Sequence, residues 1–125
     1  MKVATYPGTA LPIVQLEFRS ARGVPGVVLG SVIPDTGADT TTLPWSDCQR
    51  LNLDPALGVP GMITGVAGGM AVTIGFLVWV WLDGQEYPCQ LQGDFAAKER
   101  ILGRDVLNRL KVLFDGPASE VVFNP

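Results

Sequence analysis

Glycine and proline interrupt this chain so often that long helices are excluded. The 125 residues include 15 Gly and 10 Pro, spread along the whole length, and both residue types end helices and mark turns. The most hydrophobic run, residues 76–82, is rich in the β-branched and aromatic side chains that strands prefer. It is also far shorter than the roughly 20 residues that a membrane-spanning helix needs. The sequence therefore predicts a mainly β fold of short strands joined by turns, with no membrane segment.

Size and charge narrow the class of protein further. With 47% apolar and 17% charged residues, the chain can bury one hydrophobic core, and we expect a single domain over residues 1–125. The net charge is −3 and the basic residues are scattered, which argues against a nucleic-acid partner. Because residues 1–7 contain no long apolar stretch, no signal peptide is visible, and we expect a cytoplasmic location.

The sequence contains no histidine, and this restricts the chemistry available to it. Nucleophile systems of the Ser-His and Cys-His type and His-based metal sites are excluded, so catalysis would rest on carboxylates, Lys, Tyr or thiols. The two cysteines, Cys48 and Cys89, are too few for a disulfide scaffold and too far apart for a CxxC motif. We expect two buried, reduced thiols, with one long-range disulfide as the alternative. No cofactor is expected.

A carboxylate at the end of an apolar run is the most informative local feature. Residues 27–33 form the run, Pro34 and Asp35 end it, and a Thr-Gly-Ala-Asp stretch follows. An acid beside a glycine that admits a second backbone is typical of a reactive group on a tight loop. The alternative is a solvated turn, because Asp, Thr and Gly are common turn residues.

A glycine-rich segment lies about thirty residues further on. Residues 58–75 form two strand-like arms around a centre that contains Gly65, Gly68 and Gly69, which predicts a hairpin that can act as a mobile lid. An ordinary hairpin remains an alternative. A phosphate loop is disfavoured, because neither a Lys nor a helix pattern follows the glycines.

The remaining elements are short. Strands are predicted at residues 13–19, 27–33, 40–43, 76–82, 86–91, 112–114 and 121–123, and a loop at residues 92–100. Short helices are predicted at residues 44–51 and, after a change from strand to helix at Gly103, within residues 101–110, with Val106, Leu107 and Leu110 on one face.

Together, these motifs resemble the retropepsin family of aspartic proteases. The resemblance rests on Asp35-Thr36-Gly37-Ala38, the glycine-rich hairpin and Ile101-Leu102-Gly103-Arg104-Asp105 before a short helix, in the family's order. It spans residues 27–123. Residues 61–89 are also similar to the retroviral-protease-like domain of the eukaryotic DNA-damage-inducible ubiquitin-shuttle proteins. The resemblance implies a closed acid-protease barrel with a flap hairpin and one or two short helices, acting as an endopeptidase on peptide or protein substrates.

The resemblance also implies a role for each motif residue. Asp35 would be the catalytic carboxylate, Thr36 would brace the loop against a dimer mate, and the Gly37 backbone would contact substrate. Asp39 would help to bind the substrate main chain, and Ala38 would also belong to the substrate-binding residues.

The same resemblance also implies which residues support the site. The flap would consist of Gly65, Val66, Ala67, Gly68 and Gly69, and Ile101, Leu102 and Gly103 would cross behind the catalytic loop. Arg104 would pair with Asp39, and a bidentate guanidinium is physically suited to tie two loops together. The alternative is two unrelated surface charges.

Carboxylate-based peptide hydrolysis requires two acids that share one proton. The chain has one Asp-Thr-Gly, because Asp94, Asp105 and Asp115 lack the following Thr-Gly. The second carboxylate would then come from a second copy of Asp35, which predicts a homodimer with its site on the two-fold axis. In relatives the terminal strands often join the dimer, which directs attention to residues 3–6 and 121–123.

One residue departs from the family pattern. Relatives usually carry an apolar residue before the catalytic Asp, whereas this chain has Pro34, which cannot donate a strand hydrogen bond. Two functions therefore stay open: a homodimeric aspartic endopeptidase, and a catalytically silent module of the same fold that dimerises and binds peptide. A metal site at Asp35 and Asp39 is disfavoured, because no His and no EF-hand spacing accompany them.

Overall fold

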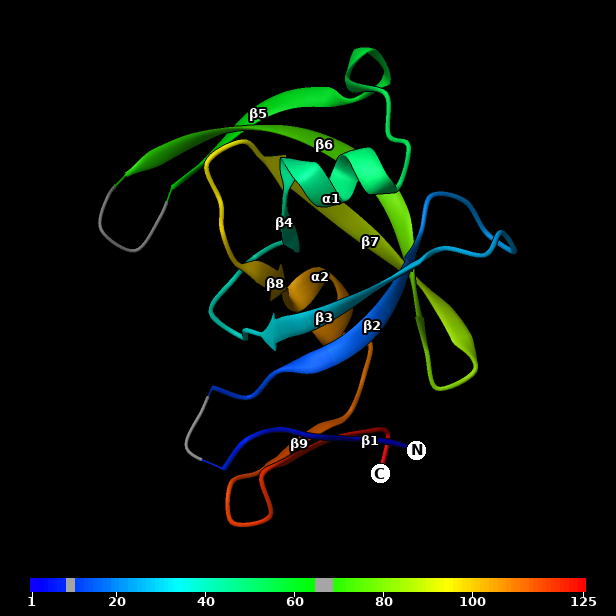
Figure 1. The fold of residues 1–125 in the computed structure, drawn as a ribbon, viewed down its shortest axis with the longest axis vertical. Helices are drawn as coiled ribbons and strands as arrows, with labels where there is room; N and C mark the ends of the chain where they lie inside the picture. Colours follow the sequence, from blue (N-terminus) through cyan, green and yellow to red (C-terminus); the bar gives the residue numbers. More distant parts are fainter. Residues whose placement is uncertain (9–10, 65–68) are drawn as a thin grey trace.

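The computed structural model describes residues 1–8, 11–64 and 69–125. Its strands are β1 (Lys2–Thr5), β2 (Val14–Arg19), β3 (Val27–Pro34), β4 (Thr42–Pro44), β5 (Val59–Thr64), β6 (Met70–Leu82), β7 (Gln85–Asp94), β8 (Arg100–Leu102), β9 (Val112–Asp115) and β10 (Glu120–Phe123). The helical elements are α1 (Trp45–Arg50), the 3-10 turn η1 (Pro55–Leu57) and α2 (Arg104–Leu107). The fold is mainly β, as the sequence predicts (Figure 1).

A closed barrel forms the body of the molecule. Its strands follow the order β2-β3-β8-β4-β7-β6, and pairing between β2 and β6 closes the ring, while β5 extends the sheet beyond β6. Two of the pairings, β3 with β8 and β4 with β7, are parallel. Parallel neighbours need long connections, so these pairs bring segments distant in sequence together. The predicted closed barrel is confirmed.

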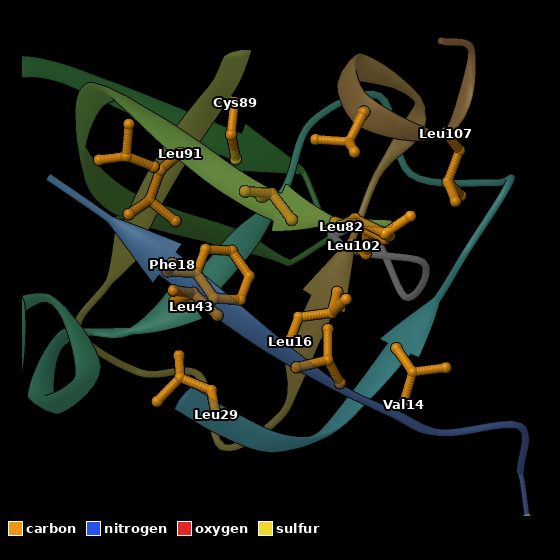
Figure 2. Close-up of a cluster of buried hydrophobic side chains, with 14 of the residues drawn as sticks. Val14, Leu16, Phe18, Leu29, Leu43, Leu82, Cys89, Leu91, Leu102 and Leu107 are labelled. Atoms are coloured by element: carbon orange, nitrogen blue, oxygen red, sulfur yellow. The ribbon is translucent and has the colours of Figure 1, made fainter. Parts of the chain in front are cut away.

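The barrel is filled by apolar side chains that come from segments far apart in the chain, from Val14 to Phe123. In β2, inward-facing Val14, Leu16 and Phe18 are buried, whereas the residues between them are at least partly exposed. Figure 2 shows Phe18 against Leu43 in this cluster. Burying each such side chain contributes about 1.5–3 kcal/mol, which makes the alternation a strong determinant of strand register.

Two strands are longer than predicted. The expected hairpin arm and the expected strand at residues 76–82 merge into β6, which pairs with β5 at one end and with β7 along most of its length. The predicted loop at residues 92–100 is wrong at its start, because β7 continues to Asp94, between β6 and β4. Gln92, Gly93 and Asp94 look like loop residues in sequence, but two neighbouring strands pair with them.

The chain termini meet in a second sheet. Its order is β1-β10-β9, with Val3 opposite Val122 and Val122 opposite Leu113. The two terminal segments singled out from the sequence therefore pair with each other within one chain. Figure 1 shows both ends of the chain beside this sheet.

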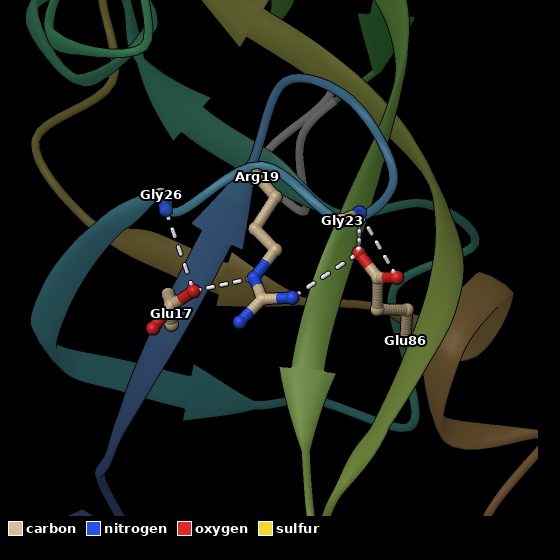
Figure 3. A network of polar contacts seen from close by, with 5 residues as sticks. All are labelled: Glu17, Arg19, Gly23, Gly26 and Glu86. Carbon is tan, nitrogen blue, oxygen red and sulfur yellow. Dashed lines mark hydrogen bonds and ion pairs between the residues drawn. The ribbon is translucent and has the colours of Figure 1, made fainter.

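A polar network fixes the turn between β2 and β3 to β7 (Figure 3). Arg19 forms ion pairs with Glu17 and Glu86, and the Glu86 carboxylate accepts the Gly23 N–H at 2.9 Å. The Gly23 N–H and the Arg19 guanidinium lower the pKa of Glu86. Glycine is required at Gly26, because a Cβ there would lie 1.8 Å from the Phe18 carbonyl oxygen.

Both cysteines are buried free thiols, in agreement with the expected reduced state. Burial raises the pKa of Cys48 to about 11 and that of Cys89 well above its ordinary value. Among the described residues, no helix combines the length and the apolar character needed to span a membrane.

Candidate active site

Pro34 ends β3 without the loss of a strand hydrogen bond. The Asp35 N–H donates to the Leu102 carbonyl oxygen at 2.9 Å, across the parallel β3–β8 pair. Successive backbone N–H groups of a strand point to opposite edges, so the Pro34 nitrogen faces away from β8. On that side, the pairing of β2 with β3 has already ended at Val32. The missing N–H of Pro34 therefore leaves no vacant position in the sheet.

The loop after Pro34 turns tightly around the Asp35 carboxylate. The Gly37 N–H donates to Asp35 Oδ1 at 2.8 Å, and the Ala38 N–H donates to the Asp35 carbonyl oxygen at 3.2 Å. Asp35 is half-buried, while Thr36 and Gly37 are exposed. These bonds fix the direction of the carboxylate and leave the tip of the loop open to a second molecule.

Arg104 fastens this loop to the start of α2 at three points. Its Nη1 donates to the Thr36 carbonyl oxygen at 2.7 Å, its Nη2 forms an ion pair with Asp39, and its backbone N–H donates to the Ala38 carbonyl oxygen at 2.9 Å. The expected pairing of Asp39 with Arg104 is thus present. Because the Asp39 side chain is 85% exposed, the ion pair itself adds little stability, and its effect is to orient the loop.

The segment Ile101-Leu102-Gly103 runs behind the loop, as the resemblance implies. Ile101 lies opposite Ile33 in β3 and opposite Thr42 in β4. Gly103 passes so close to the chain that a Cβ there would lie 2.4 Å from the Thr40 carbonyl carbon. The φ of Gly103, −93°, is accessible to any residue. Glycine is therefore needed here because a side chain would not fit, and not because of its backbone conformation.

Two supporting residues were missed in the sequence. The buried Thr41 hydroxyl accepts the Gly103 N–H at 3.1 Å and donates to Asp105 Oδ1 at 2.9 Å, while Asp105 Oδ2 accepts the Gln90 N–H at 2.8 Å. This chain of bonds joins the loop, α2 and β7. Thr41 sits in a run of three threonines, and only burial distinguishes it from its neighbours.

A groove of about 560 Å³ opens beside the loop. It is lined by Gly37, Ala38, Asp39, Thr40, Thr42, Gly61, Met62, Ile63, Thr64 and Gln92. Ala38 and Asp39 were predicted to bind substrate, and both line it. The residues from β4, β5 and β7 were not predicted, because their convergence depends on how the strands are ordered in the barrel.

The predicted flap is only partly placed. Its arms pair as expected, from Val59 opposite Gly75 to Thr64 opposite Met70. Gly65, Val66, Ala67 and Gly68 lie outside the described residues. Gly69 is exposed, and a Cβ on it would meet no atom of the described residues within 4 Å.

Among residues 1–8, 11–64 and 69–125, no three His, Cys, Asp or Glu side chains gather in an arrangement that could hold an ion. Asp39, one of the two acids considered for such a site, pairs with Arg104 instead.

The fold is shared with proteins of known structure. The chain is 27% identical to EIAV protease, solved with the inhibitor HBY-793, over 85% of this chain and 93% of that chain, with a TM-score of 0.67. It is 18% identical to a retropepsin-like aspartic protease from Rickettsia conorii, over 87% of this chain and 88% of that chain, with a TM-score of 0.61. It is 21% identical to the retroviral protease-like domain of Ddi1 from Leishmania major, over 93% of this chain and 97% of that chain, with a TM-score of 0.51.

Sequence comparison adds no nearer relative, since no family model and no curated protein matches the chain. The three structural matches agree with one another and with the resemblance carried by the motifs. The chain therefore has the fold of the retropepsin-like aspartic proteases.

Proposed function

We propose that this chain is an aspartic endopeptidase whose active site forms between two copies of Asp35. The observation that carries the proposal is the Asp35 loop: a strand-end carboxylate, oriented by the Gly37 N–H and fastened by Arg104 beside an open groove. The fold of retropepsin-like aspartic proteases supports the same reading.

The reaction needs one ionised and one protonated carboxyl group. The ionised Asp35 accepts a proton from water, whose oxygen attacks the carbonyl carbon of the peptide bond, while the protonated Asp35 donates its proton to the carbonyl oxygen. The first carboxyl then gives the proton it took from water to the amide nitrogen, and the second takes a proton from a hydroxyl of the tetrahedral gem-diol. Collapse of this intermediate breaks the C–N bond and releases the amine and a carboxylic acid, which restores the carboxyl pair. Two adjacent carboxyls cannot both ionise readily, so the pair titrates in two macroscopic steps.

A homodimer supplies the second acid in this proposal. Thr36 and Gly37 are exposed at the tip of the loop, where Thr36 would brace the loop against its mate. A two-fold axis through this tip would place the two Asp35 residues in one site.

The groove offers backbone hydrogen-bonding groups to an extended peptide. β5 ends the order of the larger sheet, so its outer edge can pair with a substrate backbone by strand addition. The backbone of Gly37 and the side chain of Asp39 would hold the other side of the peptide. The hairpin that includes Gly65 to Gly69 would close over it and exclude water.

The test is digestion of a peptide library by the wild type, by Asp35→Asn and by Asp54→Asn, from acidic to neutral pH. Asp54 is an exposed acid that caps η1, and Asn also serves as a cap, so this variant is the matched control. We expect cleavage by the wild type and by Asp54→Asn, strongest at mildly acidic pH, and none by Asp35→Asn.

Persistent cleavage by Asp35→Asn would refute the proposal. So would the absence of any cleavage by a wild-type chain that light scattering shows to be dimeric. The second outcome would identify the chain as a silent, peptide-binding module of the same fold.

A further inference from the structure

Gln92 is a polar side chain in the wall of the groove, on β7. It lies opposite Gly75 of β6, and Thr73 and Gly61 lie on the same face of the sheet. A Cβ at Gly75 would lie 2.9 Å from Gln92 Nε2, and one at Gly61 would lie 3.8 Å from Gln92 Oε1. The two glycines therefore leave the space in which the Gln92 amide lies against the sheet.

Thr73 fixes which end of this amide is available. The Thr73 side chain is fully buried, and its hydroxyl donates to Gln92 Oε1 at 2.8 Å. With Oε1 held in this way, Nε2 is the free end of the amide, since no hydrogen bond from it is found within the described residues. No fully buried polar side-chain atom of these residues lacks a partner, so Nε2 is accessible from the groove. An N–H₂ group with a fixed direction, on a half-buried residue, is a prepared donor for a ligand.

The groups around Gln92 select the kind of side chain that fits. Thr40, Thr42 and Thr64 add hydroxyl groups to the same groove, and Asp39 adds a carboxylate. A neutral carboxamide can accept a hydrogen bond from Gln92 Nε2 and donate its own N–H₂ to a threonine hydroxyl. An acidic side chain would meet no cation among the described lining residues, since Arg104 already pairs with Asp39. An apolar side chain would leave the Gln92 donor without a partner.

We propose that this part of the groove is a polar subsite that prefers asparagine or glutamine in the bound peptide, with Gln92 as its specificity-determining residue. The inference rests on the proposed function for its cleavage readout, but peptide binding tests it separately. Sites built to hydrogen-bond a side chain reject analogues that lack the polar group. Because Gln92 is only half-buried, we expect a preference of about tenfold rather than the larger ratios of closed pockets.

The test uses peptides that differ only in Gln, Met or Glu at one position, scanned along an octapeptide. Gln and Met have similar length, so their ratio of cleavage rates isolates the amide. The variant is Gln92→Glu, which keeps an acceptor for Thr73 but removes the N–H₂ donor; Gln92→Met serves as a second variant. The same ratios are measured as binding by fluorescence anisotropy in the Asp35→Asn background.

We expect one position at which the wild type favours Gln over Met by about tenfold, with Glu disfavoured, and at which Gln92→Glu loses the Gln preference. Cleavage with no position selective for Gln, or with a Gln preference that survives both variants, would overturn the subsite and leave the protease proposal standing. Selective binding without cleavage would support the subsite and overturn the protease proposal. A chain that neither cleaves nor binds the peptides would overturn both.

Discussion

Gly103→Ala tests how tightly the support of the catalytic loop is packed. The backbone of Gly103 adopts φ −93° and ψ −177°, which alanine tolerates. The new methyl group, however, would lie 2.4 Å from the Thr40 carbonyl carbon and 2.5 Å from its oxygen. Both atoms belong to the backbone, so no side-chain rotation relieves the contact, and β8 must move away from the loop.

The cost can be worked out from the contacts involved. Overpacking of this kind costs about 1–3 kcal/mol. Separation of the two segments also weakens the hydrogen bonds from Gly103 N–H to Thr41 Oγ1 and from Arg104 N–H to the Ala38 carbonyl, each about 1 kcal/mol. Alanine recovers up to about 1 kcal/mol by restricting the unfolded chain. We expect a net loss of about 2–4 kcal/mol in the free energy of unfolding, the sum of these terms.

Urea denaturation followed by tryptophan fluorescence measures this loss. The matched control is Gly30→Ala, because Gly30 also lies in a barrel strand, β3, but a Cβ there would meet no atom of the described residues within 4 Å. Gly30→Ala should change stability by less than about 1 kcal/mol, while Gly103→Ala lowers the midpoint by about 1–2 M urea. Equal midpoints for the two variants would show that the loop and β8 are not in the close contact described.

Two further predictions concern groups away from the groove. Asp47 is buried and accepts two hydrogen bonds from Arg100, at 2.8 and 3.0 Å. Asp47→Asn should therefore lower the free energy of unfolding, measured by thermal or urea denaturation, by about 2–4 kcal/mol. The exposed-site control Gln49→Glu should change it little, and equal losses in the two variants would contradict the role of the pair. Burial raises the pKa of Cys48 in the folded chain to about 11, above the ordinary 9.0. The stability that this neutral thiol contributes is therefore fully present below pH 9 and is lost as the pH rises toward 11. Cys48→Ala should therefore flatten the alkaline fall in stability, and an unchanged slope would refute the assignment.

Much of the barrel could be predicted from local patterns. The alternation of Val14, Leu16 and Phe18 marks β2, and the Asp83-Gly84 turn marks the join between β6 and β7, because each signal is carried by neighbouring residues. The Asp39–Arg104 pair could also be anticipated, since both residues lie in recognisable motifs.

The groove could not be predicted in the same way. Gln92 looks like a loop residue, and only the pairing of β7 with β6 and β4 brings it beside the Asp35 loop. The same holds for Thr41, whose hydroxyl matters because it is buried against Gly103. The surroundings of both residues depend on the order of the strands in the barrel, which no local sequence pattern predicts. Likewise, the sheet can accommodate a proline at Pro34 only because the pairing of β2 with β3 ends before it, at Val32.

The central claim is that two chains share one active site. Mixing wild-type chain with Asp35→Asn, after subunit exchange at fixed total concentration, tests it most directly. If each site needs two intact Asp35 residues, cleavage falls with the square of the wild-type fraction, so an equal mixture retains about one quarter of the activity. A linear fall, with about one half retained, or a wild type that cleaves no peptide would contradict the account.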